Sequence, residues 1–155
     1  MGKLHTRVRD QLTLYVRQLA WLNATPKPPE GSRAADPRFK RPELSRMAQM
    51  KKDGITVKMP SNPLPSVIGW LLEIGLAEAA GMGTVPIGWS TIDAWQRTTG
   101  VQLAPWQARL LRHLSTEYVA ESRKAEDATC PAPWRVETTD KEREIAQRRL
   151  EMVLG

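Results

Sequence analysis

The residues of this chain that could carry out covalent chemistry are few. Cys130 is the single thiol, and His5 and His113 are the only imidazoles in 155 residues. A nucleophilic site needs a base beside the nucleophile and a third group that orients the base. Cys130 lies between Thr129 and Pro131, far in sequence from His113, and no local signature joins the two. The sequence therefore predicts no nucleophilic site.

Other kinds of catalytic site are also poorly represented. His113 is four residues before Glu117 in a stretch with helical periodicity, and we interpret it as an interfacial histidine that pairs along its own helix. Glycine-rich phosphate loops and the zinc-protease motif are missing, and so few Cys and His residues do not suit a structural zinc site. A catalytic site made of two carboxylates stays open, because the fold can bring together residues that are distant in sequence. We expect a protein that is not an enzyme and that needs no cofactor or metal.

Positive charge is concentrated in the first third of the chain. Residues 1–60 carry 13 Lys and Arg against 5 Asp and Glu, whereas residues 61–155 carry 10 against 12. Clustered cations are what phosphate binding requires, but Phe39 is the only aromatic residue between 33 and 58, so no stacking platform for bases is evident. Nucleic acid is expected to be a minor partner. The residues predicted to contact a polyanion are Arg38, Lys40, Arg41, Arg46, Lys51 and Lys52.

Tryptophan is unusually abundant, with six residues against two tyrosines and one phenylalanine. Indoles are enriched where proteins bind partners. Trp89 and Trp95 are about 240° apart around a helix and cannot share a face. If Trp95 packs against the apolar face of the 105–124 helix, which contains Trp106, then Trp89 stays near the surface. Trp134, which follows two prolines in a turn, is also expected near the surface. The alternative is that both outer indoles cover the ends of the core. The predicted partner contacts are Trp89, Arg109, Arg112 and Trp134.

The elements that must position these residues are helices, as the spacing of apolar residues indicates. A proline-rich linker separates the first helix from the others, and a short basic helix over 44–52 and an extended connector over 55–59 follow it. The segment from Pro65 is apolar almost all round, typical of a central buried helix. The main predicted helices span 3–23, 65–80, 90–98, 105–124 and a final segment from 139.

Three short signals set the predicted helix boundaries. Ser90 and Asp93 have the spacing of a capping box, and Gly100 would end the helix that they open. Gly81 would end the preceding helix. Thr139 and Glu142 form a second capping box, which would open the last helix.

These observations predict an all-α protein: a small helical domain of about five helices with an N-terminal helix and a proline-rich linker. The expected regions are an N-terminal helix with a basic arm (1–60), a helical core (61–136) and a charged C-terminal helix (137–155). One cysteine excludes an internal disulfide and suits a reducing compartment. No signal peptide is recognisable, and the longest apolar stretch is too short to cross a bilayer. We expect a cytoplasmic protein.

Residues 87–134 resemble a segment of the tail assembly chaperones of tailed bacteriophages. Those proteins carry a Trp-containing helix, a Thr-Gly break, and a second helix that begins with Pro-Trp. Gln107 departs from the family, which usually has an acidic residue there. The preceding helix from Pro65 is compatible, whereas residues 1–60 lie outside the resemblance. The matching positions are Ser90, Ile92, Ala94, Trp95, Thr99, Gly100, Pro105, Trp106, Leu111, Arg112, Leu114 and Ser115.

The resemblance implies a non-enzymatic factor of virion morphogenesis that coats the tape-measure protein and recruits tail-tube subunits in the host cytoplasm. Two alternatives stay open. One is a structural adaptor in the neck or tail of the virion. The other is a nucleic-acid-binding accessory protein that uses residues 33–58. Association between copies of the chain also stays open.

Overall fold

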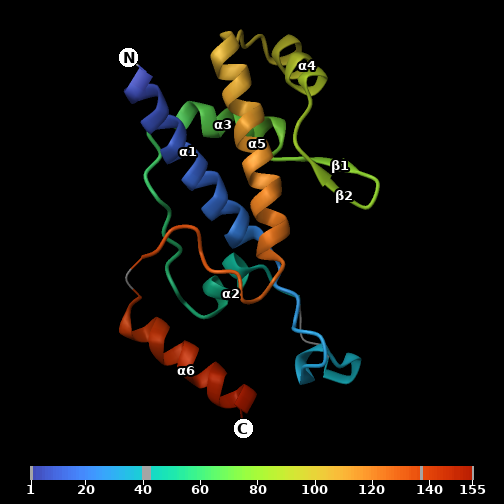
Figure 1. The fold of residues 1–155 in the computed structure, drawn as a ribbon, viewed down its shortest axis with the longest axis vertical. Helices are drawn as coiled ribbons and strands as arrows, with labels where there is room; N and C mark the ends of the chain where they lie inside the picture. Colours follow the sequence, from blue (N-terminus) through green and yellow to red (C-terminus); the bar gives the residue numbers. More distant parts are fainter. Residues whose placement is uncertain (1, 40–42, 137, 155) are drawn as a thin grey trace.

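The computed structural model describes residues 2–39, 43–136 and 138–154. Within these ranges the chain forms six α-helices, two short 3₁₀ turns and one β-hairpin (Figure 1). The all-α prediction is confirmed in its broad form, with six helices instead of five and a small hairpin in addition. The helices are α1 Gly2–Asn23, α2 Arg46–Lys52, α3 Pro65–Ile74, α4 Trp89–Thr99, α5 Pro105–Ala125 and α6 Asp140–Leu154, the 3₁₀ turns are Arg33–Ala35 and Pro37–Phe39, and the strands are β1 Glu78–Ala80 and β2 Gly83–Val85.

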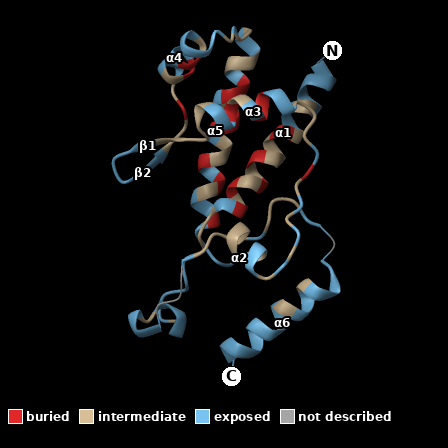
Figure 2. Ribbon diagram, turned by 180° about the vertical axis from the view of Figure 1, so that it is seen from behind, coloured by how far each residue is buried: buried red, intermediate tan, exposed pale blue. Residues whose placement is uncertain are grey.

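The core lies between α1 and α5, which run side by side for most of their length (Figures 1 and 2). Apolar residues at spacings of three and four place one stripe of each helix against the other. Helix α3 and the segment before α4 cover this pair at one end. The core therefore uses residues on both sides of the boundary expected at residue 60. Its buried members are Leu12, Val16, Val67, Ile68, Leu71, Ile87, Ile92, Leu110, Leu111 and Leu114.

The prediction of one helix from Pro65 to about residue 80 is wrong. Helix α3 ends at Ile74, because Gly75 adopts φ +113°, a region that glycine enters without steric cost. The following residues form strand β1, which pairs antiparallel with β2 around a turn at Gly81. Helix α3 is also not buried all round, since Leu72 is exposed. Among the described residues, no helix is long and apolar enough to cross a membrane.

Ser115 of α5 fixes both ends of the hairpin segment to the core. Its hydroxyl is fully buried, accepts a hydrogen bond from the Ile87 amide at 2.9 Å and donates one to the Leu76 carbonyl at 2.7 Å. Buried backbone groups need such partners, because an unpaired group loses its hydration without compensation. Ser115 therefore positions the chain that leads into α4.

The Ser115→Ala variant should lower the free energy of unfolding by about 2 kcal/mol or more, since it leaves two backbone groups without their partner. Urea denaturation would measure the change. Thr116→Ala is a matched control: the Thr116 hydroxyl is exposed and bonds only to its own helix, so we expect a change within about 0.5 kcal/mol. Equal stability of wild type and Ser115→Ala would contradict the assignment.

Glu78 of β1 holds the start of α4. The predicted capping box at Ser90 and Asp93 is wrong, because the N-cap is Gly88 and Ser90 lies inside the helix. Glu78 accepts hydrogen bonds from the Thr91 hydroxyl and from the Gly88 amide, the latter at 3.0 Å. These bonds, that from Thr91 first, hold the pKa of Glu78 below its usual value. A carboxylate from a neighbouring strand thus replaces the local cap.

Two other boundary predictions are confirmed. Gly100 ends α4 in the left-handed conformation, with φ +75°. Thr139 and Glu142 form the reciprocal capping box before α6, with distances of 3.3 Å and 2.9 Å. The connector over 55–59 contains no strand, as expected.

The depressed pKa of Glu78 predicts a contribution to acid unfolding. A carboxyl whose pKa is lower in the folded state stabilises the protein above its unfolded pKa, near 4.5, and this stabilisation is lost as the pH falls through the folded pKa. Glu78→Gln should therefore lose less Tm between pH 6 and pH 3 than wild type does. Parallel Tm curves for the two proteins would contradict this role for Glu78.

Candidate partner-binding groove

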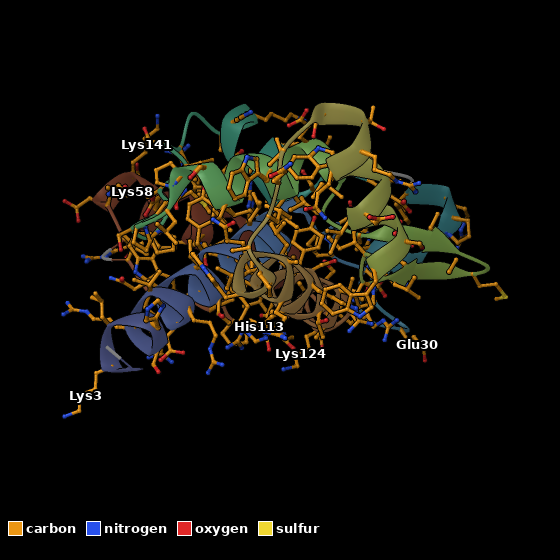
Figure 3. All side chains as sticks on the ribbon, turned by 90° about the horizontal axis from the view of Figure 1, so that it is seen from above. Lys3, Glu30, Lys58, His113, Lys124 and Lys141 are labelled. Atoms are coloured by element: carbon orange, nitrogen blue, oxygen red, sulfur yellow. The ribbon has the colours of Figure 1, made fainter. Side chains whose placement is uncertain are left out.

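A groove of about 470 Å³ opens between the N-terminal halves of α1 and α5. We call it the α1–α5 groove. Its floor is apolar, and two histidines and two arginines surround it. Figure 3 looks down on this end of the molecule and labels His113 on α5. The lining residues are Leu4, His5, Val8, Arg9, Leu64, Trp106, Arg109, Leu110 and His113.

Two large apolar side chains at this groove are exposed to solvent. Leu4 is 66% exposed and Trp106 is 47% exposed. Both lie in the first turns of their helices, Leu4 in α1 and Trp106 in α5. Exposed apolar surface of this kind marks sites where a protein binds a partner.

The expected contact between Trp95 and the Trp106 stripe is not observed. Trp95 is buried and packs against Trp70 of α3, with ring centroids 6.3 Å apart. Trp106 instead packs edge to face against His5 of α1 at 6.1 Å. Helix α4 therefore closes over α3, and this arrangement leaves the Trp106 indole free to contact a ligand in the groove.

The rim of the groove is cationic and continues along α5. Arg9 and Arg109 line the groove, and Arg112 lies one turn further on, above the ring of Trp89 at 5.3 Å. Arginine in this position forms a cation–π contact. Trp89 is 52% exposed. Among the ion pairs of the described residues, none involves Arg9, Arg109 or Arg112.

Arg109 and Arg112 thus lie on the N-terminal half of α5, and Trp89, at the start of α4, contacts Arg112. Trp134 lies elsewhere. The backbone amide of Trp134 donates a hydrogen bond to the buried Gln18 side chain at 3.2 Å. Gln18 belongs to the C-terminal half of α1, and the groove lies at its N-terminal half. Trp134 is half-buried, and both interpretations of its indole, partner contact or cover of the core, stay predictions.

The predicted polyanion contacts do not form one surface. Arg46 donates hydrogen bonds to the carbonyls of Trp21, Ala125 and Asp127 at 3.1, 2.7 and 2.9 Å and stacks over the Trp21 ring at 4.6 Å. Burial lowers the pKa of its guanidinium. Its prediction as a polyanion contact is corrected, because its donors are used within the chain.

The other predicted polyanion contacts differ in their surroundings. The Arg38 side chain donates to both carboxylate oxygens of Asp36, which holds the pKa of Asp36 below its usual value. Lys51 and Lys52 are exposed in the last turn of α2. Lys40 and Arg41 lie outside the described residues. Of the six predicted polyanion contacts, Lys51 and Lys52 are therefore the exposed cations that form no ion pair with a described side chain.

The two residues first considered for catalysis take structural positions. His113 Nε2 lies 3.1 Å from the hydroxyl of Thr13 on α1, so it bonds across the helix pair and not to Glu117. The carbonyl of Cys130 accepts a hydrogen bond from the Trp21 indole at 2.9 Å. In the part of the chain that the structure describes, no group of three or more His, Cys, Asp or Glu residues could hold a metal.

Sequence reasoning missed the α1 side of the groove. Leu4, His5 and Val8 form it with Trp106. No signal in the sequence showed this, because periodicity does not show which residues of two helices a third helix covers. An apolar floor with a cationic rim suits an amphipathic helix that carries acidic residues along one edge. Comparisons with known proteins found no matching family model, no similar curated protein and no similar solved structure.

Proposed function

We propose that this protein is a bacteriophage tail assembly factor that acts as a chaperone and not as an enzyme. In this proposal the α1–α5 groove binds a segment of the tape-measure or tail-tube protein in the host cytoplasm. The observation that carries the proposal is the pair of exposed apolar side chains, Leu4 and Trp106, beside the cations Arg9 and Arg109.

The positions of the residues behind the tail-chaperone resemblance support this proposal. Ile92, Trp95, Leu111 and Leu114 are buried, so one part of the motif packs the interior. Trp106 and Arg112 are exposed on α5, where they are available to a partner. A motif with both buried and exposed positions is expected of a binding module, in which some residues build the fold and others contact the partner.

The groove also indicates the chemistry of the partner segment. A helix that binds a groove places apolar side chains at i, i+3 or i+4, and i+7 on the floor. Aspartate or glutamate at its edge would meet Arg9 and Arg109, which increases specificity and association rate more than affinity. We therefore expect amphipathic, acidic-edged helices in the bound protein.

Two observations on infected cells test the proposal. The tagged protein should copurify with the tape-measure or tail-tube protein before assembly is complete, and mass spectrometry should find it absent from purified particles. Its stoichiometric presence in particles would favour the virion adaptor instead. Retention of DNA with no tail protein would favour the nucleic-acid-binding alternative. Cys130→Ser should support normal phage production when the variant folds.

A further inference from the structure

Helices α1 and α5 run parallel, and contacts between them recur at matching levels (Figure 1). His5 meets Trp106 in the first turns, with ring centroids 6.1 Å apart, and Thr13 meets His113 about two turns further on, at 3.1 Å. The Thr13 hydroxyl also donates to the carbonyl of Arg9 at 2.8 Å, so a lone pair of its oxygen accepts the proton of His113. These contacts fix the register of the two helices along the α1–α5 groove.

Arg9 and Arg109 lie at one level of the groove, between these two contacts. Arg9 is four residues before Thr13, and Arg109 is four residues before His113. Each arginine therefore lies about 6 Å along its helix axis from the lower contact, since a helix rises about 1.5 Å per residue. Both side chains line the groove and both are exposed. Two guanidinium groups from facing helices thus share one level.

The described residues supply no carboxylate to this pair of arginines. None of the residues that line the groove is acidic, and no ion pair among the described residues involves Arg9 or Arg109. Asp10, which follows Arg9 in the sequence, lines a different pocket of α1. By contrast Arg17, two turns further along α1, meets a buried carboxylate of α5 at 3.3 Å. The two positive charges in the groove are thus available to an anion from another molecule.

The apolar floor lies directly beside the two arginines. Trp106 is one turn before Arg109 on α5, Val8 precedes Arg9 on α1, and both line the groove. A ligand that binds here meets an apolar surface and two cations together. A carboxylate suits two guanidinium groups, because its two oxygens accept hydrogen bonds from planar forks of donors.

We propose that the α1–α5 groove recognises an apolar group joined to a carboxylate. The carboxylate lies between Arg9 and Arg109, and the apolar group lies on Trp106. This inference deepens the proposed function and rests on it for the source of the carboxylate, which is an aspartate or glutamate side chain in a helix of the tail partner, one turn from an apolar side chain. Both parts are needed, so an amphipathic helix that lacks this acidic residue binds poorly.

Small probes test the site without any phage protein. 4-Phenylbutyrate joins a ring to a carboxylate, 4-phenylbutyramide replaces the carboxylate with a neutral amide of similar shape, and acetate lacks the ring. The NMR signal of the Trp106 indole N–H, assigned by its loss in Trp106→Phe, reports binding to the full chain. We expect a Kd of about 1 mM for phenylbutyrate, and binding of the amide and of acetate that is weaker by roughly tenfold or more.

Arg9→Gln and Arg109→Gln should each weaken the binding of phenylbutyrate by roughly tenfold. Arg7→Gln is the matched control, because it removes an exposed arginine of α1 that lines the other pocket, and it should bind like wild type. Circular dichroism of each variant confirms that it is folded. An indole signal that phenylbutyrate leaves unchanged at about 20 mM, well above that Kd, would overturn the proposal. So would equal binding of the amide, or an equal loss in Arg7→Gln.

Two helical peptides test the source of the carboxylate. Both are alanine-based, acetylated and amidated, with leucine at i, i+3 and i+7, and they carry either glutamate or glutamine at i+4. The glutamate peptide should bind wild type more tightly by roughly tenfold, and the difference should vanish in Arg109→Gln. Equal binding of the two peptides to wild type would overturn the assignment to a side chain. The proposed function fails separately, if the protein copurifies with no tail protein, whatever the probes show.

Discussion

Replacing Arg46 with alanine is expected to lower the free energy of unfolding by about 3 kcal/mol or more. Its guanidinium joins three segments, since it donates to carbonyls at the end of α1, at the end of α5 and in the loop after α5. A hydrogen bond with one charged partner contributes roughly 1.5–3 kcal/mol, and partial exposure at this site reduces the sum of three. For a chain of this size the Tm should fall by roughly 6–12 °C.

Lys52→Ala is the matched control for Arg46→Ala, because it removes one exposed cation from the same helix. It should change stability by no more than about 0.5 kcal/mol. Arg46→Lys should recover little of the loss, since an ammonium group cannot reproduce the planar set of donors. If Arg46→Ala melts like wild type and instead weakens binding to DNA, the earlier interpretation as a polyanion contact is right.

The groove variant, Trp106→Ala with Arg109→Glu, should weaken binding to the tail partner by roughly 30-fold or more, the effect of losing a contact worth about 2 kcal/mol. Both side chains are exposed, so the Tm should change little. Titration of the purified partner segment into wild type and variant would measure the difference. The matched control is Arg97→Ala with Met82→Ala, which removes one cation and one large apolar side chain from exposed positions outside the groove. An equal loss of affinity in that control would place the binding surface elsewhere.

Local signals in the sequence were enough to locate most of the helices. The periodicity of α1 and α5 is long, and Pro105, Gly100 and the Thr139 capping box act within one turn of the residues that they affect. Such signals need no knowledge of the tertiary fold. The same reasoning identified Trp89, Arg109 and Arg112 as surface residues of one region.

The wrong predictions have a common physical cause: the structure at these places depends on contacts with residues that are distant in sequence. Helix α3 stops at Gly75 because the following residues pair in a hairpin that Ser115 fixes to α5. Helix α4 begins at Trp89 because a carboxylate from β1 replaces the local capping box. Arg46 belongs to a basic stretch in the sequence, yet its donors meet carbonyls from residues 21, 125 and 127. None of these partners can be identified from local spacing.

The floor of the groove was missed for a related reason. Trp106 continues the apolar stripe of α5, and periodicity alone assigns it to the core. Whether such a residue is covered depends on the length of the helix that packs there, and α3 is only ten residues long. The exposed ends of α1 and α5 are therefore a tertiary property. They are also the feature from which the proposed function follows.

Site-specific photocrosslinking in infected cells would show whether the α1–α5 groove binds a tail protein. A photoreactive amino acid is placed at position 106 in the groove and, as a control, at position 82 in the hairpin turn, where Met82 is fully exposed. We expect position 106 to crosslink to the tape-measure or tail-tube protein and position 82 not to. Crosslinks from position 82 alone, or from neither position in a protein that still supports tail assembly, would contradict the proposed binding site.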